Sequence, residues 1–137
     1  MKKKRTWKVV LSILLGFQVL VAGSLALFAL FDFPGLLEQF GLKHQPDMGI
    51  LQLIMTYNLA LSASICAWAV VWLRRDQLAG VQTGTTVGLL IFLTSMIVFI
   101  QFNRVDILLF DGVRALLMVV SGALAYREHQ RHHSTVK

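Results

Sequence analysis

The sequence predicts an all-α integral membrane protein: a four-helix bundle of up-down-up-down topology, with a short interfacial helix between spans one and two. Four long apolar stretches make up most of the 137 residues. The composition is 56% hydrophobic and only 15% charged, and the mean hydropathy of +0.68 is too high for a soluble domain of this size. The connections between the stretches are short, so consecutive helices are expected to run antiparallel.

The four spans are expected at about residues 9–31, 48–73, 78–102 and 107–126. The first three contain no Asp, Glu, Lys or Arg. Each exceeds the roughly 20 residues that a helix needs to cross a hydrocarbon core of about 30 Å. Together they form one transmembrane domain over residues 1–137. A lysine-rich start followed by an apolar run also begins a secretory signal peptide, but this run is too long for one, so we expect span one to be retained.

The net charge of +6 is concentrated at span ends on one side of the predicted bundle. Lys43 and Arg104 are the basic residues at the span ends of the opposite side. By the positive-inside rule, both termini are expected to face the cytoplasm, with the protein in the cell (inner) membrane. No nucleic-acid partner is expected, because no basic stripe with interleaved aromatic residues is present. Ten of the thirteen basic residues flank the cytoplasmic side: Lys2, Lys3, Lys4, Arg5, Lys8, Arg74, Arg75, Arg127, Arg131 and Lys137.

The segment between spans one and two, residues 32–47, has the period of an amphipathic helix. Its apolar residues recur at i, i+3, i+4 and i+7, and Pro34 and Gly41 stand near the start and at the end. We interpret it as a short helix that either lies in the outer membrane interface or folds as a cap over the mouth of the bundle. Both placements bury the same face: Phe33, Leu36, Leu37 and Phe40.

Small residues in spans three and four predict close helix packing. Gly80, Gly84 and Gly88 are spaced four apart, and glycines at this interval leave a groove into which a second helix fits. Gly122 and its neighbours form a second, less specific face of this kind. We interpret these glycines as packing residues, within the protein or between subunits; the alternative is a glycine-lined ligand groove.

The polar residues within the spans are the candidates for ligand binding. In the predicted orientation most of them fall in the outer half of the bundle or near its middle, whereas the inner half has few hydrogen-bonding side chains. This asymmetry predicts a polar cavity that opens outward. The candidates are Gln18, Gln52, Asn58, Thr94, Gln101, Asp111 and Arg114.

Asp111 and Arg114 are the most informative of these residues, because ionisable groups at membrane depth are costly. They are three apart on a helix and so share a face. One reading is an internal ion pair, hydrogen-bonded by Gln18, Asn58 or Thr94. The other is a site in which Arg114 holds an acidic or carbonyl-bearing ligand, or Asp111 a cationic one.

The sequence lacks the residues that several activities require. No histidine lies in a span, so an intramembrane haem or pigment site is not expected within one chain. The histidines of the C-terminal tail are interpreted as part of a solvated tail, and no metal site is predicted. Cys66 is the single cysteine, which excludes an internal disulfide. We assign no catalytic residue and identify no cofactor, because no nucleophile and base, or carboxylate pair, are clustered.

A lysine-led first span, the segment FPGLLEQFGL at residues 33–42 and three further short-looped spans resemble the DoxX-like group of small bacterial membrane proteins. The resemblance covers the layout of the chain and includes no sharp motif. It implies a four-span bundle and, for some members, a role as membrane subunit of an oxidoreductase complex. It carries no site residue over to this sequence.

Two classes of function remain open from the sequence. The first is a non-enzymatic accessory or interaction subunit that binds lipid or quinone between its helices, with membrane lipid, a membrane-protein partner or a second copy as partners. The alternative is a small transporter or membrane-embedded enzyme that uses an outward-opening polar cavity around Asp111 and Arg114.

Overall fold

The computed structural model describes residues 6–43 and 45–134, and within them it contains helices and no strands. The elements are α1 (Thr6–Phe31), α2 (Phe33–Gln39), α3 (Gly49–Arg74), α4 (Leu78–Phe102), α5 (Val105–Ile107) and α6 (Val113–Ser134). A five-residue π-helical segment, η1 (Leu108–Gly112), joins α5 to α6. The predicted all-α fold is confirmed.

Four helical segments are long and apolar enough to span a membrane: 26 residues in α1, 26 in α3, 24 in α4 and 27 from Val105 to Arg131. Their apolar side chains also point outward, since Leu20 is 68% exposed, Ile50 75% and Ile100 74%. In water such faces would form large unfavourable apolar patches, whereas in lipid they are the expected surface. The protein is therefore a multi-pass membrane protein.

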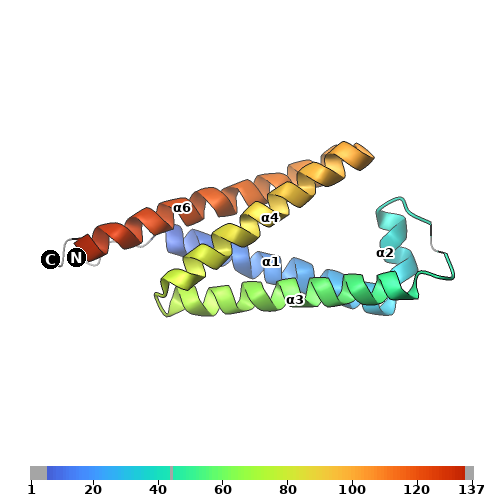
Figure 1. Ribbon diagram of the computed structural model, residues 1–137, viewed down its shortest axis with the longest axis horizontal. Coiled ribbons are helices and arrows are strands. Elements are labelled where there is room, and N and C mark those ends of the chain that lie inside the picture. The colour runs from blue at the N-terminus through green and yellow to red at the C-terminus, as the bar shows by residue number, and fades with distance from the viewer. Residues whose placement is uncertain (1–5, 44, 135–137) are drawn as a thin grey trace.

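The four long helices form an up-down-up-down bundle made of two pairs. α1 packs against α3 and α4 packs against α6, and the contacts α3 with α4 and α1 with α6 close the ring. Figure 1 shows that the pairs meet where both termini and the α3–α4 turn lie, which we call the terminal end. They diverge toward the opposite end, which holds α2 and the α4–α5 turn and which we call the loop end.

The predicted short helix is confirmed as α2, and it packs onto the bundle as a cap. Asp32 precedes it and accepts a hydrogen bond from the Gly35 backbone N–H at 3.1 Å. A Cβ on Gly35 would lie 2.3 Å from Asp32 Oδ2, so a larger residue there would displace the Asp32 side chain from its present position. Phe33, Leu36 and Leu37 are buried against Ala29 of α1 and partly buried residues of α3, while Phe40 stays 39% exposed.

The fourth span differs from its predicted bounds at both ends. The helix does not stop at Tyr126 but continues to Ser134, so His129 belongs to a helix and not to a flexible tail. The residues after Tyr126 are polar, yet they include no Gly or Pro to end the helix. At the other end the helix begins after η1, a π-helical turn that the sequence pattern does not predict.

The buried core consists of two clusters at different depths. The larger one joins all four long helices around Leu11, Leu15, Cys66 and Met118. The smaller one holds α2 against α1 and α3 near the loop end. On α1, Leu15 belongs to the first cluster and Ala29 to the second. Between them Gln18, Val21, Ala22 and Leu25 line the space where the helix pairs diverge.

The four glycines singled out in the sequence all lie where two helices approach each other. A Cβ on Gly80 would lie 2.6 Å from the Leu73 backbone nitrogen of α3. On Gly88 it would lie 2.8 Å from Met118 Cβ of α6, and on Gly122 2.0 Å from Thr85 Oγ1 of α4. Gly84 instead faces the flexible leucine side chains of α1, with Leu15 Cδ1 at 3.0 Å.

An ion pair that the sequence did not predict lies at the terminal end. Lys8 of α1 is buried and donates a hydrogen bond to Asp76 Oδ1 in the α3–α4 turn. Its Nζ also lies 3.3 Å from Nδ1 of His129 on α6. The partners are 68 and 121 residues apart in the chain, which is why a local pattern gave no sign of them. This cluster connects both helix pairs where they meet.

Candidate ligand-binding cavity

A cavity of about 640 Å³ lies between the two helix pairs, and Leu37 and Phe40 of the α2 segment are among its lining residues. This volume is within the range of roughly 300–1,000 Å³ that small-molecule sites occupy. Most of its wall is aliphatic and comes from α1, α2, α3 and α4. The polar side chains among its lining residues are Gln18, Ser62, Thr94, Ser95, Arg104, Asp111 and Arg114.

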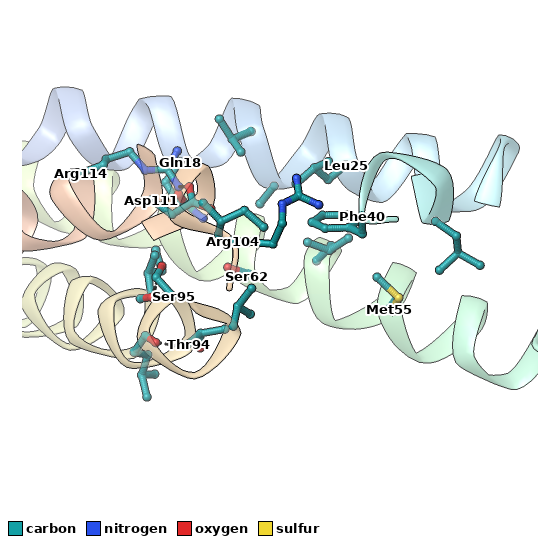
Figure 2. A pocket seen from close by; sticks show the side chains of 18 of the residues that line it. Gln18, Leu25, Phe40, Met55, Ser62, Thr94, Ser95, Arg104, Asp111 and Arg114 are labelled. Carbon is teal, nitrogen blue, oxygen red and sulfur yellow. Dashed lines mark hydrogen bonds and ion pairs between the residues drawn. The ribbon is translucent and has the colours of Figure 1, made fainter. Parts of the chain in front are cut away.

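Figure 2 shows the head groups of Gln18, Asp111 and Arg114 together on the α1–α6 side of this cavity. Arg114 Nη2 donates a hydrogen bond to Asp111 Oδ1 at 2.5 Å. The two partners differ in burial: the Arg114 side chain is 9% exposed and the Asp111 side chain is 34% exposed. Both residues line the cavity, and Asp111 is the more exposed partner of the pair.

The local backbone places this pair. Asp111 lies within η1, and Arg114 is the second residue of α6. Gly112 is buried, and a Cβ there would lie 3.2 Å from Leu108 Cδ1 and 3.9 Å from Ser95 Cβ of α4. π-helical turns recur at functional sites of proteins, where they change the direction of neighbouring side chains.

Arg114 retains unused hydrogen-bonding capacity. Its Nε and Nη1 are buried and have no hydrogen-bond partner among the residues that the structure describes. The guanidinium carbon lies 5.5 Å from the ring centroid of Phe17 and 5.5 Å from that of Phe110. The two rings stabilise the positive charge, but they accept no conventional hydrogen bond from these N–H groups.

Gln18 supplies a second unpaired polar atom in the same place. It is 7% exposed, and its Oε1 has no partner within the described chain. Buried donors or acceptors without a partner are uncommon in native proteins, and each costs about 1–3 kcal/mol. Arg114 and Gln18 together therefore form a polar cluster that is incomplete by itself.

Arg104 lies apart from this cluster, near Phe40 of the α2 segment (Figure 2). Its Nε and Nη2 donate to the two carboxylate oxygens of Asp106 at 2.9 and 2.7 Å. The hydrogen bond to Asp106 raises the pKa of Arg104, so this guanidinium stays charged. Its Nη1 lies 3.5 Å from the Gln39 carbonyl oxygen, which links the α4–α5 turn to α2.

The structure brings four of the seven predicted ligand residues to the cavity: Gln18, Thr94, Asp111 and Arg114. The Thr94 hydroxyl donates to the Leu90 carbonyl of its own helix at 2.9 Å, so it contributes an acceptor to the cavity and does not reach Arg114. Asp111 is the observed hydrogen-bond partner of Arg114.

The other three predicted residues lie away from the cavity lining. Gln52 Nε2 donates to the carbonyl oxygens of Ala29 and Leu30, at 2.9 and 3.2 Å, and so fastens the start of α3 to the end of α1. Asn58 and Gln101 are exposed on the outer surface of the bundle. Polarity at a given depth does not show which face of a helix a residue occupies.

Three polar lining residues were not among the predicted ligand residues: Ser62, Ser95 and Arg104. Ser95 is buried and donates to the Ile91 carbonyl at 2.8 Å, and it neighbours Thr94, which was selected. Arg104 was assigned only to a turn. The Phe17 and Phe110 rings beside Arg114 left no signal, because apolar residues in a span give no hint of a cation–π contact.

Comparison with known proteins found no matching family model, and no curated protein or solved structure with significant similarity. The DoxX-like resemblance therefore stays a prediction. Within residues 6–43 and 45–134, no group of three or more His, Cys, Asp or Glu side chains is placed to hold a metal ion.

Proposed function

We propose that this membrane protein binds an amphiphilic small molecule, a lipid or a quinone, between its two helix pairs. The proposal depends mainly on Arg114, which lies beside a largely aliphatic cavity. Two nitrogens of its buried guanidinium have no partner in the described part of the chain. An oxygen acceptor on the ligand would pair with them, and an apolar tail would cover the aliphatic wall. The separation of polar cluster and aliphatic wall matches a molecule with a polar head and an apolar body.

We further propose a non-enzymatic role, as an accessory or interaction subunit. Covalent or hydrolytic catalysis requires a nucleophile next to a base. Among the described lining residues, Thr94 and Ser95 bond to their own helix, and the one carboxylate is that of Asp111, which is paired with Arg114. A role as membrane subunit of an oxidoreductase complex would follow from the DoxX-like resemblance.

A small transporter is the second candidate, and the arrangement of the helices favours it. α1 with α3 and α4 with α6 form two closely packed pairs that diverge toward the loop end. Two such units can rock against each other around a binding site between them, as the repeats of many transporters do. Uptake of a ligand into liposomes containing the purified protein would favour this candidate over a static binding protein.

The binding proposal predicts a specific co-purifying molecule. The wild-type protein, purified in a mild detergent and extracted for mass spectrometry, is expected to carry one amphiphile well above its abundance in the membrane. Arg114→Gln should lose it, because the variant removes the guanidinium donors. Arg75→Gln is the matched control, since Arg75 is exposed at the end of α3. Identical lipid profiles for all three proteins, each resembling the bulk membrane, would contradict the proposal.

The topology belongs to the same proposal: both termini and the Arg74–Asp76 turn in the cytoplasm, with residues 32–47 and 104–106 outside. It is supported by the ten basic residues on the terminal side. Single cysteines at Lys43 and Gln130, in a Cys66→Ala background, are expected to differ in intact cells. An impermeant thiol reagent should label the first and not the second. Labelling of position 130 alone would show the opposite orientation.

A further inference from the structure

We infer that the ligand of this cavity is an anionic amphiphile, with a carboxylate or phosphate head beside Arg114 and an apolar chain along the α1–α3 wall. The inference rests on the proposed function and names the chemical class of its ligand. It follows from three properties of the cavity: the charged residues that line it, the hydrogen-bonding groups of Arg114 that lack a partner, and the position of the aliphatic wall.

The charged residues that line the cavity are Arg104, Asp111 and Arg114. Two guanidinium groups and one carboxylate lie at the cavity wall, and the carboxylate of Asp106, which is paired with Arg104, brings the formal charge of the four groups to zero. Asp106 pairs with Arg104, but its side chain is 63% exposed and that of Arg104 33%, so this pair lies at the mouth. Partly exposed pairs generally contribute little to stability, whereas a bidentate arginine–carboxylate pair such as this one contributes more.

Arg114 is the stronger determinant, because its charge lies at membrane depth. Among the described residues, Asp111 compensates this charge through one hydrogen bond, and Nε and Nη1 have no partner. A neutral carbonyl would satisfy one donor without adding charge. A carboxylate or phosphate offers charged oxygen acceptors, and charge-assisted hydrogen bonds are about twice as strong as neutral ones. Nε and Nη1 are covered in the present side-chain position, so ligand entry includes a rotation of the guanidinium between the two phenylalanine rings.

The remaining wall determines the apolar part of the ligand. From Gln18 the lining continues along α1 through Val21, Ala22 and Leu25, toward Leu37 of α2 and Met55 and Leu59 of α3. These side chains carry no hydrogen-bonding group, so a chain of methylene groups is the complementary surface. Figure 2 shows Leu25 and Met55 on the same side of the cavity as Phe40, away from the Arg114 cluster.

The test compares acids with neutral partners of the same chain on the delipidated full-length protein in neutral detergent. The probes are oleate with methyl oleate, monooleoyl phosphatidate with monoolein, and inorganic phosphate alone. Binding is measured as the concentration dependence of the thermal unfolding temperature. At a pH where the acids are ionised, at least one acid is expected to bind about tenfold more tightly than its neutral partner. The preferred acid identifies the head group as carboxylate or phosphate.

Variants then locate the head group. Arg114→Gln should lower the affinity for the acid much more than the affinity for the neutral partner, so that the acid loses its advantage. Arg104→Gln should give a smaller loss, and Arg75→Gln none. The comparison of acid and neutral probes uses the wild-type protein and does not depend on any variant. If Arg114→Gln folds poorly, this comparison and the Arg104→Gln variant still test the inference.

Several results would overturn the inference. Equal affinity for acid and neutral partner would refute it and leave the proposed binding of an amphiphile intact. Inorganic phosphate binding as tightly as the acids would show an anion site without a role for the chain. An acid preference that persists fully in Arg114→Gln would place the head group elsewhere. Failure of every amphiphile to bind would refute the proposed function itself.

Discussion

Gly80→Ala is expected to destabilise the bundle by about 2–3 kcal/mol, the upper part of the range for overpacking a well-packed core. Its added methyl group would lie 2.6 Å from the Leu73 backbone nitrogen and 2.9 Å from the Ala69 carbonyl oxygen. Both obstacles are backbone atoms of α3, so the clash is relieved only when α3 and α4 move apart. Unfolding of the purified protein in detergent, by heat or by added SDS, measures the loss.

The other glycines form a graded series in the same measurement. Gly88→Ala meets Met118 Cβ and the Ala115 carbonyl oxygen and should also destabilise, whereas Gly84→Ala meets only the flexible ends of Leu15 and Leu11 and should cost less. Gly23→Ala is the matched control, because nothing lies within 4 Å of the new methyl group. There the higher helix propensity of alanine should stabilise by up to about 1 kcal/mol. Equal losses at all positions would show that general glycine effects, and not helix contacts, govern stability.

The fold was predictable because its determinants are local and repeated. Span length, the absence of charge from three spans and the short connections each depend on neighbouring residues, and together they allow few arrangements. The four-residue spacing of Gly80, Gly84 and Gly88 likewise marks one face of a single helix. The spacing does not show which helix each glycine contacts. In the structure Gly80 faces α3, Gly84 faces α1 and Gly88 faces α6.

The candidate site was predictable only in part, for the same reason. The spacing of Asp111 and Arg114 is enough to predict a shared face and a contact, and the structure shows both. Gln18 was selected by polarity and depth, and it reaches the cavity because its face of α1 turns inward. Asn58 satisfied the same criteria but lies on an exposed face of α3. Depth can be read along one helix, whereas orientation depends on how four helices pack.

The features that the sequence could not provide all arise from long-range packing. The Lys8–Asp76 pair joins residues 68 positions apart. The two rings beside Arg114 come from different elements, Phe17 from α1 and Phe110 from η1. The cavity itself depends on the divergence of the helix pairs, which no single segment encodes. The difference in burial within the Asp111–Arg114 pair is also a tertiary property, and it determines the order of the mutational effects.

Asp111→Asn is expected to destabilise the protein more than Arg114→Gln, and more than the double variant. The neutral asparagine leaves the Arg114 guanidinium, whose side chain is 9% exposed, without a compensating charge. Breaking a buried ion pair from one side costs about 3–5 kcal/mol, and the exposure of Asp111 favours the lower end of that range. Arg114→Gln instead leaves Asp111, which at 34% exposure retains access to water in the cavity and loses less.

The Arg104–Asp106 pair is the matched control, since it has the same chemistry at the mouth of the cavity. Asp106→Asn should change stability much less than Asp111→Asn does, because both partners are partly exposed. The two single variants of the buried pair, their combination and this control are compared by unfolding in detergent after delipidation, so that ligand binding does not contribute. If Asp111 and Arg114 neutralise each other, the double variant regains part of the stability that Asp111→Asn loses. Additive and small effects would instead mean that Arg114 turns toward the membrane surface once Asp111 is gone, and that the pair has no shared structural role.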